Sequence, residues 1–144
     1  MKKKWFLGMA AIVFVVLFLV IVNSKNSSSF DYPPSESVVC STEVKEYPLE
    51  TDKIIISISN NGNAPQSFSH PHLEYQRNGT WYYAKRNRNE NMTAELPGVS
   101  PGIPSSYTLY LEEYAPYLTV GHYRAVFPFY GSSGYFSFEF DIVN

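Results

Sequence analysis

Apolar and polar residues alternate in short runs over most of the chain beyond residue 38. The run at residues 53–60 puts three isoleucines on one face and serines on the other, and the C-terminal run places Phe136, Phe138, Phe140 and Ile142 opposite Ser137, Glu139 and Asp141. A period of two residues is that of a β-strand with one buried face. Weaker runs at 39–47, 72–83, 105–111 and 122–127 bring the prediction to six or seven strands.

The first 23 residues follow a different pattern. Lys2, Lys3 and Lys4 precede an uncharged run from residue 5 to residue 22. As a helix this run is roughly 27 Å long, close to the roughly 30 Å of bilayer hydrocarbon. It predicts an uncleaved signal anchor or, alternatively, a cleaved signal peptide, whose apolar core is usually shorter. With the lysines on the cytoplasmic side, the rest of the chain is outside the cytoplasm under both interpretations.

The chain after the leader divides into a spacer and one domain. Residues 24–38 include six serines and two prolines, and too few of them are apolar to form a core. We therefore expect a flexible spacer at 24–38 and a single folded domain at 39–144. Cys40 is the only cysteine, so this domain must be stable without an internal disulfide.

Residues 72–83 predict a hairpin whose turn contains Asn78 and Gly79. A two-residue Asn-Gly turn would place Tyr75 opposite Tyr82. A three-residue loop at 77–79 would instead place Tyr75 opposite Trp81 and put four large side chains on one face, Leu73, Tyr75, Trp81 and Tyr83. Because burial of each large side chain is favourable by roughly 1.5–3 kcal/mol, we predict the three-residue loop.

A tyrosine corner is predicted near the start of the second-last strand. An apolar turn ending at Gly121 is followed by Tyr123, from which a strand runs to Phe127. In two-sheet sandwiches such a tyrosine buries its ring and bonds its hydroxyl to the chain just upstream. Together with Trp81 on an early hairpin, this pattern predicts an antiparallel β-sandwich, with Tyr123, Trp81 and Gly121 as structural residues.

Several of these features together resemble a known family. Tyr47, the strand from Ile54 to Asn60, Trp81 after a glycine turn, Leu96-Pro97-Gly98 and the Gly121-x-Tyr123-Arg124 segment resemble the bacterial immunoglobulin-like domains of small exported proteins of Gram-positive bacteria. The layout is more distantly similar to an intracellular proteinase inhibitor of the same bacteria. The resemblance implies an all-β, immunoglobulin-like sandwich of about seven strands, and an exported, non-catalytic role without cofactors.

No residue pattern indicates catalysis. His70, His72 and His122 are the only histidines, and without cysteine or aspartate ligands near them we predict no metal site. The neighbouring Glu112 and Glu113 would point to opposite faces of a strand, so they do not form a catalytic pair. The serines lie in turn-rich stretches and lack the elbow motif of serine hydrolases.

Charge and exposed aromatic residues define the expected partners. Beyond Lys25 the chain has seven basic residues and all 13 acidic ones, which argues against binding of nucleic acid. Tyrosine-rich loops favour recognition, and Tyr82, Tyr110, Tyr114, Tyr117, Tyr130 and Tyr135 are predicted at outward or loop positions. The predicted contact residues are Tyr130 and Tyr135, with Lys85, Arg86 and Arg88 as a basic group.

The predicted function is that of a membrane-tethered, extracytoplasmic module that binds a protein or a cell-wall component. The alternative is a proteinase inhibitor that acts through an exposed loop at residues 89–103, which contains Pro97 and Pro101 and is followed by Pro104.

Overall fold

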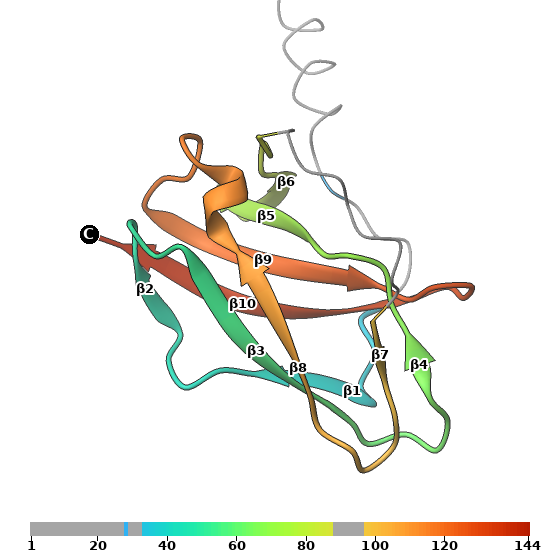
Figure 1. Cartoon of the computed structure of the whole chain (residues 1–144). Coiled ribbons are helices and arrows are strands. Elements are labelled where there is room, and N and C mark those ends of the chain that lie inside the picture. Colours follow the sequence, from blue (N-terminus) through green and yellow to red (C-terminus); the bar gives the residue numbers. More distant parts are fainter. Residues whose placement is uncertain (1–27, 29–32, 88–96) are drawn as a thin grey trace, which may run out of the picture.

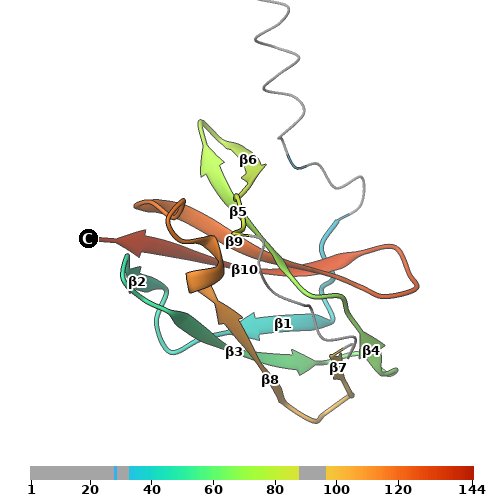
Figure 2. The same ribbon diagram turned by 45° about the horizontal axis from the view of Figure 1, so that its top comes forward.

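The computed structural model describes residue 28 and residues 33–87 and 97–144, which form two facing β-sheets (Figure 1). One sheet has the order β1-β3-β8, with β1 at Val38–Ser41, β3 at Lys53–Asn60 and β8 at Ser105–Tyr110. The other has the order β2-β10-β9-β5-β6, made by Glu46–Pro48, Tyr135–Val143, Gly121–Pro128, His72–Arg77 and Thr80–Tyr83. The two layers separate clearly in Figure 2.

Two smaller elements complete the described fold. A short ribbon pairs β4 (Gln66–Ser67) with β7 (Gly98–Val99), and the 3-10 helix η1 (Leu111–Tyr114) connects β8 to the turn before β9. Neighbouring strands are antiparallel except β2 and β10, which are parallel. The prediction of an all-β, immunoglobulin-like sandwich is confirmed.

The core between the sheets follows the predicted alternation. The inward residues of β3 and β10 are all buried, namely Ile54, Ile56, Ile58, Phe136, Phe138, Phe140 and Ile142, whereas Ile55 on the other face of β3 is exposed. Aromatic rings fill the centre, where Phe127 and Phe136 stack at 4.8 Å between centroids and Phe68 meets both rings edge-on. Ala125 is fully buried two residues after Tyr123, where antibody domains carry the second cysteine of their disulfide. Packed rings therefore replace that covalent link.

The prediction of a single first strand at 39–47 is wrong, because this segment forms two strands that belong to different sheets. β1 pairs antiparallel with β3, whereas β2 runs parallel to β10. Between them the chain crosses from one sheet to the other. The crossing is held by the Tyr47 hydroxyl, which donates to the Val44 carbonyl at 2.9 Å, and by the Lys45 carbonyl, which accepts from Asp141 N–H at 2.8 Å.

The predicted three-residue loop of the hairpin is also wrong. Arg77 pairs with Thr80, so the turn has two residues, Asn78 and Gly79, with φ of 52° and 76°. Two consecutive left-handed residues define the tight turn that matches strand twist and that Asn-Gly favours. Turn geometry therefore sets the register, and Trp81 lies on the outer face of the sheet. It is stabilised there by the Arg124 guanidinium, 4.4 Å from the centre of its ring.

The residues immediately before β1 are attached to the domain by backbone hydrogen bonds. Ser35 N–H donates to the Tyr135 carbonyl and the Ser37 carbonyl accepts from Asn61 N–H, both at 2.7 Å, and β1 begins at Val38. The predicted leader helix at 1–23 lies outside the described residues, as does most of the predicted spacer. Within residues 28, 33–87 and 97–144, no helix combines the length and apolar character needed to cross a membrane.

Candidate functional site

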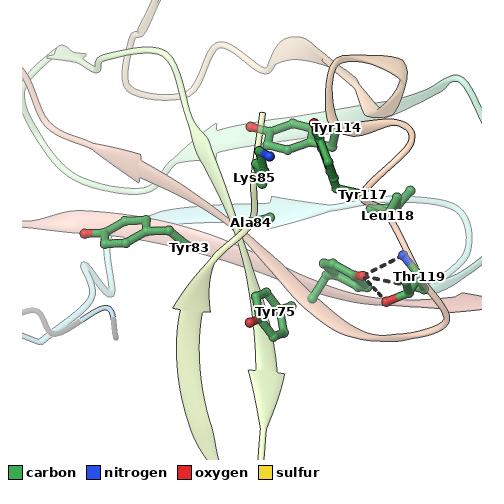
Figure 3. A pocket seen from close by; sticks show the side chains of 9 residues that line it. Tyr75, Tyr83, Ala84, Lys85, Tyr114, Tyr117, Leu118 and Thr119 are labelled. Atoms are coloured by element: carbon green, nitrogen blue, oxygen red, sulfur yellow. Dashed lines mark hydrogen bonds between the residues drawn. The ribbon is translucent and has the colours of Figure 1, made fainter. Parts of the chain in front are cut away.

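A cleft of about 390 Å³ opens at the end of the sandwich where β9 begins (Figure 3). The chain leaving β6 supplies Ala84 and Lys85, and the turn after η1 supplies Leu118 and Thr119. Five tyrosines complete the lining, Tyr75, Tyr83, Tyr114, Tyr117 and Tyr123. The Tyr83 ring points away from the others and packs near His72, 5.0 Å between ring centroids. We call this feature the tyrosine cleft.

The inner wall of the tyrosine cleft is fixed by hydrogen bonds. The buried Tyr123 hydroxyl donates to the Thr119 carbonyl at 2.8 Å and accepts from Thr119 N–H at 3.1 Å, which is the tyrosine corner expected from the sequence. The buried Tyr114 hydroxyl accepts from Leu73 N–H at 3.2 Å. Burial raises the pKa of Tyr114. The Tyr114 phenol is therefore neutral, and the hydrogen bonds of both phenols give them a structural role.

The open side of the cleft carries Lys85 and Tyr117. The Lys85 ammonium lies 4.1 Å from the centre of the Tyr117 ring, a cation-π contact. Arg86 next to it forms a 2.5 Å ion pair with Glu113, and Asn87 N–H donates to the Glu113 carbonyl. Among the described residues no carboxylate lies within ion-pair distance of Lys85. No described carboxylate therefore balances its positive charge.

A buried ion pair lies at the same end of the sandwich, on the outer face of the sheet that contains β5 and β9. Glu74 has no exposed surface, and its two carboxylate oxygens contact Arg124 Nε at 2.6 Å and His72 Nε2 at 2.9 Å. Burial alone would raise the pKa of Glu74, but these partners outweigh it and the pKa is lowered. Glu74 is therefore ionised, and Arg124 stands between it and the Trp81 ring.

The three histidines have separate partners. His70 contacts the Tyr107 hydroxyl at 3.1 Å, His72 contacts Glu74, and His122 lies 2.7 Å from Asp141 and 3.3 Å from Glu139. The hydrogen bond with Asp141, with a smaller effect of Glu139, raises the pKa of His122 despite partial burial. In the part of the chain that the structure describes, no group of three potential ligands could hold a metal ion.

Comparison with known proteins places the chain in a family. The model of the bacterial Ig-like domain matches residues 34–140. The chain belongs to this family. No curated protein and no solved structure gives a significant match. Ig-like domains of this kind are typically non-catalytic binding or structural modules.

In the Ig-like domain, the residues that were predicted to make contacts lie in two separate places. Lys85 and Arg86 lie at the cleft, Arg88 is outside the described residues, and Tyr130 is 62% exposed beyond the far end of β9. Eight residues of β9, at about 3.3 Å each, separate the two groups. The expectation that Tyr135 is outward is wrong. It is the first residue of β10, opposite Pro128, and only 6% exposed.

Sequence reasoning also misplaced Tyr114, which is buried, whereas Tyr110 and Tyr117 are exposed as expected. It did not find the Ig-like domain's cleft or its buried ion pair. Glu112 and Glu113, which were considered at strand positions, lie in the helix η1, which places Tyr114 inward and is followed by Tyr117 at the rim. A usable signal for the ion pair was present, since Glu74 and Arg124 both occupy outward positions on strands that pair.

Proposed function

We propose that the chain is a membrane-tethered, extracytoplasmic Ig-like module that binds a protein or cell-wall component at the tyrosine cleft. The observation that carries the proposal is the cleft itself, a concave site with a rigid inner wall and an open rim of Tyr117 and Lys85. Clefts of a few hundred Å³ with convergent polar groups are the usual form of ligand sites. Tyrosine gives a large contact area at low entropic cost.

The proposed location of the domain outside the cytoplasm rests on the N-terminal segment, residues 1–23. Three lysines followed by an uncharged run long enough for the bilayer support an anchor with the domain outside. A Ser132→Cys variant tests this, because Ser132 is exposed in the β9–β10 turn. A membrane-impermeant maleimide should label it on intact cells. Cys40 should react slowly, since burial raises the pKa of its thiol to about 12. Labelling that requires cell lysis would contradict an extracytoplasmic domain.

Binding at the cleft is tested by placing a photo-crosslinking amino acid at position 117 in cells that produce the full chain. Position 110 is the matched control, because Tyr110 and Tyr117 are each 46% exposed and Tyr110 is outside the cleft. We expect adducts from position 117 and few or none from position 110. Equal adducts from both positions, or none from 117, would refute a binding role for the cleft.

The inhibitor alternative gains no support from the part of its loop that the structure describes. Residues 89–96 lie outside the described residues, while Gly98 and Val99 form β7 and pair with β4. Val99 is buried. A segment fixed in this way does not present an extended backbone to a protease, so we do not propose inhibition.

A further inference from the structure

We infer that the tyrosine cleft takes an anionic glycan, a sugar chain that carries carboxylate or phosphate groups. The inference rests on the proposed binding function and specifies its ligand. It follows from the charge of the cleft, from the state of its backbone groups, and from the kind of surface that its side chains present.

The charge of the cleft is opposite to that of the domain around it. Of the described residues that line the cleft, only Lys85 is charged, although acidic residues outnumber basic ones beyond the leader. The neighbouring guanidinium of Arg86 is already paired with Glu113. An anionic ligand group that meets Lys85 would therefore gain an ion pair without displacing a carboxylate of the protein.

Several backbone groups at the cleft are already hydrogen-bonded, including Ala84 N–H and both backbone groups of Thr119, which argues against a peptide strand as the ligand. Ala84 N–H donates to the Leu73 carbonyl at 2.8 Å, and Asn87 N–H donates to the Glu113 carbonyl at 2.7 Å. Peptides that add to a sheet edge need such groups to be free. The aliphatic side chains of the described lining are Ala84 and Leu118, too few for the groove that holds an amphipathic helix.

Recognition must therefore use side chains, and these are rings and hydroxyls. The exposed Tyr117 and the half-buried Tyr75 offer ring surfaces and hydroxyl groups. The hydroxyls of Tyr114, Tyr123 and Thr119 are already hydrogen-bonded within the protein. A sugar ring has a C–H face that packs on an aromatic ring and hydroxyls that pair with phenols. The Lys85 ammonium beside Tyr117 places the positive charge next to such a stacked ring.

The test measures binding of four probes to the purified full chain in detergent by isothermal titration calorimetry. The probes are a hyaluronan tetrasaccharide, a phosphorylated pentamannose, neutral chitotetraose and a tetraglutamate peptide. We expect one or both anionic glycans to bind at least about tenfold more tightly than the other two. The anionic glycan that binds more tightly shows whether carboxylate or phosphate is the preferred group.

The variants Lys85→Gln and Tyr117→Ala should each weaken glycan binding about tenfold, and Lys45→Gln and Tyr110→Ala should not change it. Both controls alter exposed residues outside the cleft. Thermal melts verify that each variant is folded. Equal affinity for chitotetraose or tetraglutamate, no effect of Lys85→Gln, or no binding of any probe would overturn the ligand class. The crosslinking from position 117 would still decide separately whether the cleft binds a partner.

Discussion

The two ends of the sandwich are built on different principles. At the β9–β10 turn the chain is held by rings, with Phe129 against Phe136 and Phe136 stacked on Phe127. At the cleft end, rings are combined with polar contacts, the Tyr123 hydroxyl bonds inside and the Glu74–Arg124 ion pair outside. Directional polar bonds hold segments of several elements around an open concave surface, and this is the end where we place function.

The largest expected effect of a single substitution concerns the ion pair. Glu74→Ala leaves Arg124 buried without its carboxylate, with its side chain only 12% exposed. Loss of one partner of a buried pair costs about 3–5 kcal/mol. Urea denaturation should show this loss, whereas Glu46→Ala, which alters an exposed residue of β2, should change the free energy of unfolding by less than about 0.5 kcal/mol. Similar values for both variants would mean that the ion pair does not stabilise the cleft end.

The tyrosine corner gives the next largest effect. Tyr123→Phe keeps the ring but removes the hydroxyl that bonds both the N–H and the carbonyl of Thr119. We expect a loss of about 1–2 kcal/mol in the free energy of unfolding. At the opposite end, Tyr130→Phe removes an exposed hydroxyl and should have almost no effect. Equal shifts of the melting temperature in the two variants would contradict the proposed difference between the two ends.

The smallest effect is a pH dependence on the outer face of the sheet, near the start of β9. The pKa of His122 is raised in the folded state by Asp141 and Glu139, so its stabilising contribution is fully present below the unfolded pKa. It is lost as the pH rises through the folded pKa. Because this histidine is partly exposed, the contribution should be less than about 1 kcal/mol. The stability difference between wild type and His122→Gln should therefore be larger at pH 5.5 than at pH 8.5, and a pH-independent difference would be inconsistent with this role.

The sequence predicted those parts of the fold that depend on local periodicity. The alternation of Ile54, Ile56 and Ile58, and that of the phenylalanines in β10, required only that one face of each strand be buried, and both are buried. The tyrosine corner could be predicted because its turn and its tyrosine lie within a few residues of each other, and the hydroxyl bonds a residue only four positions away.

The rest depended on contacts that leave no periodic signal. The hairpin register was mispredicted because burial of Trp81 was weighed above the preference of Asn78-Gly79 for a two-residue turn. Trp81 is instead stabilised on the outer face by Arg124, 43 positions further along the chain. The cleft combines the chain after β6, the turn after η1 and the start of β9. Lys85 was predicted as a contact residue, but its position beside Tyr117 follows only from the tertiary structure.

The most direct test of the account compares the two ends in one binding measurement. The purified full chain, labelled with a fluorophore, is incubated with cell envelopes of the producing organism, and the retained fraction is measured for wild type, Tyr117→Ala and Tyr130→Ala. Both substitutions remove an exposed tyrosine, one at the cleft and one at the β9–β10 turn. We predict that Tyr117→Ala lowers the affinity for envelopes about tenfold while Tyr130→Ala leaves it unchanged. Loss of retention in Tyr130→Ala with normal retention in Tyr117→Ala would contradict the assignment of function to the cleft.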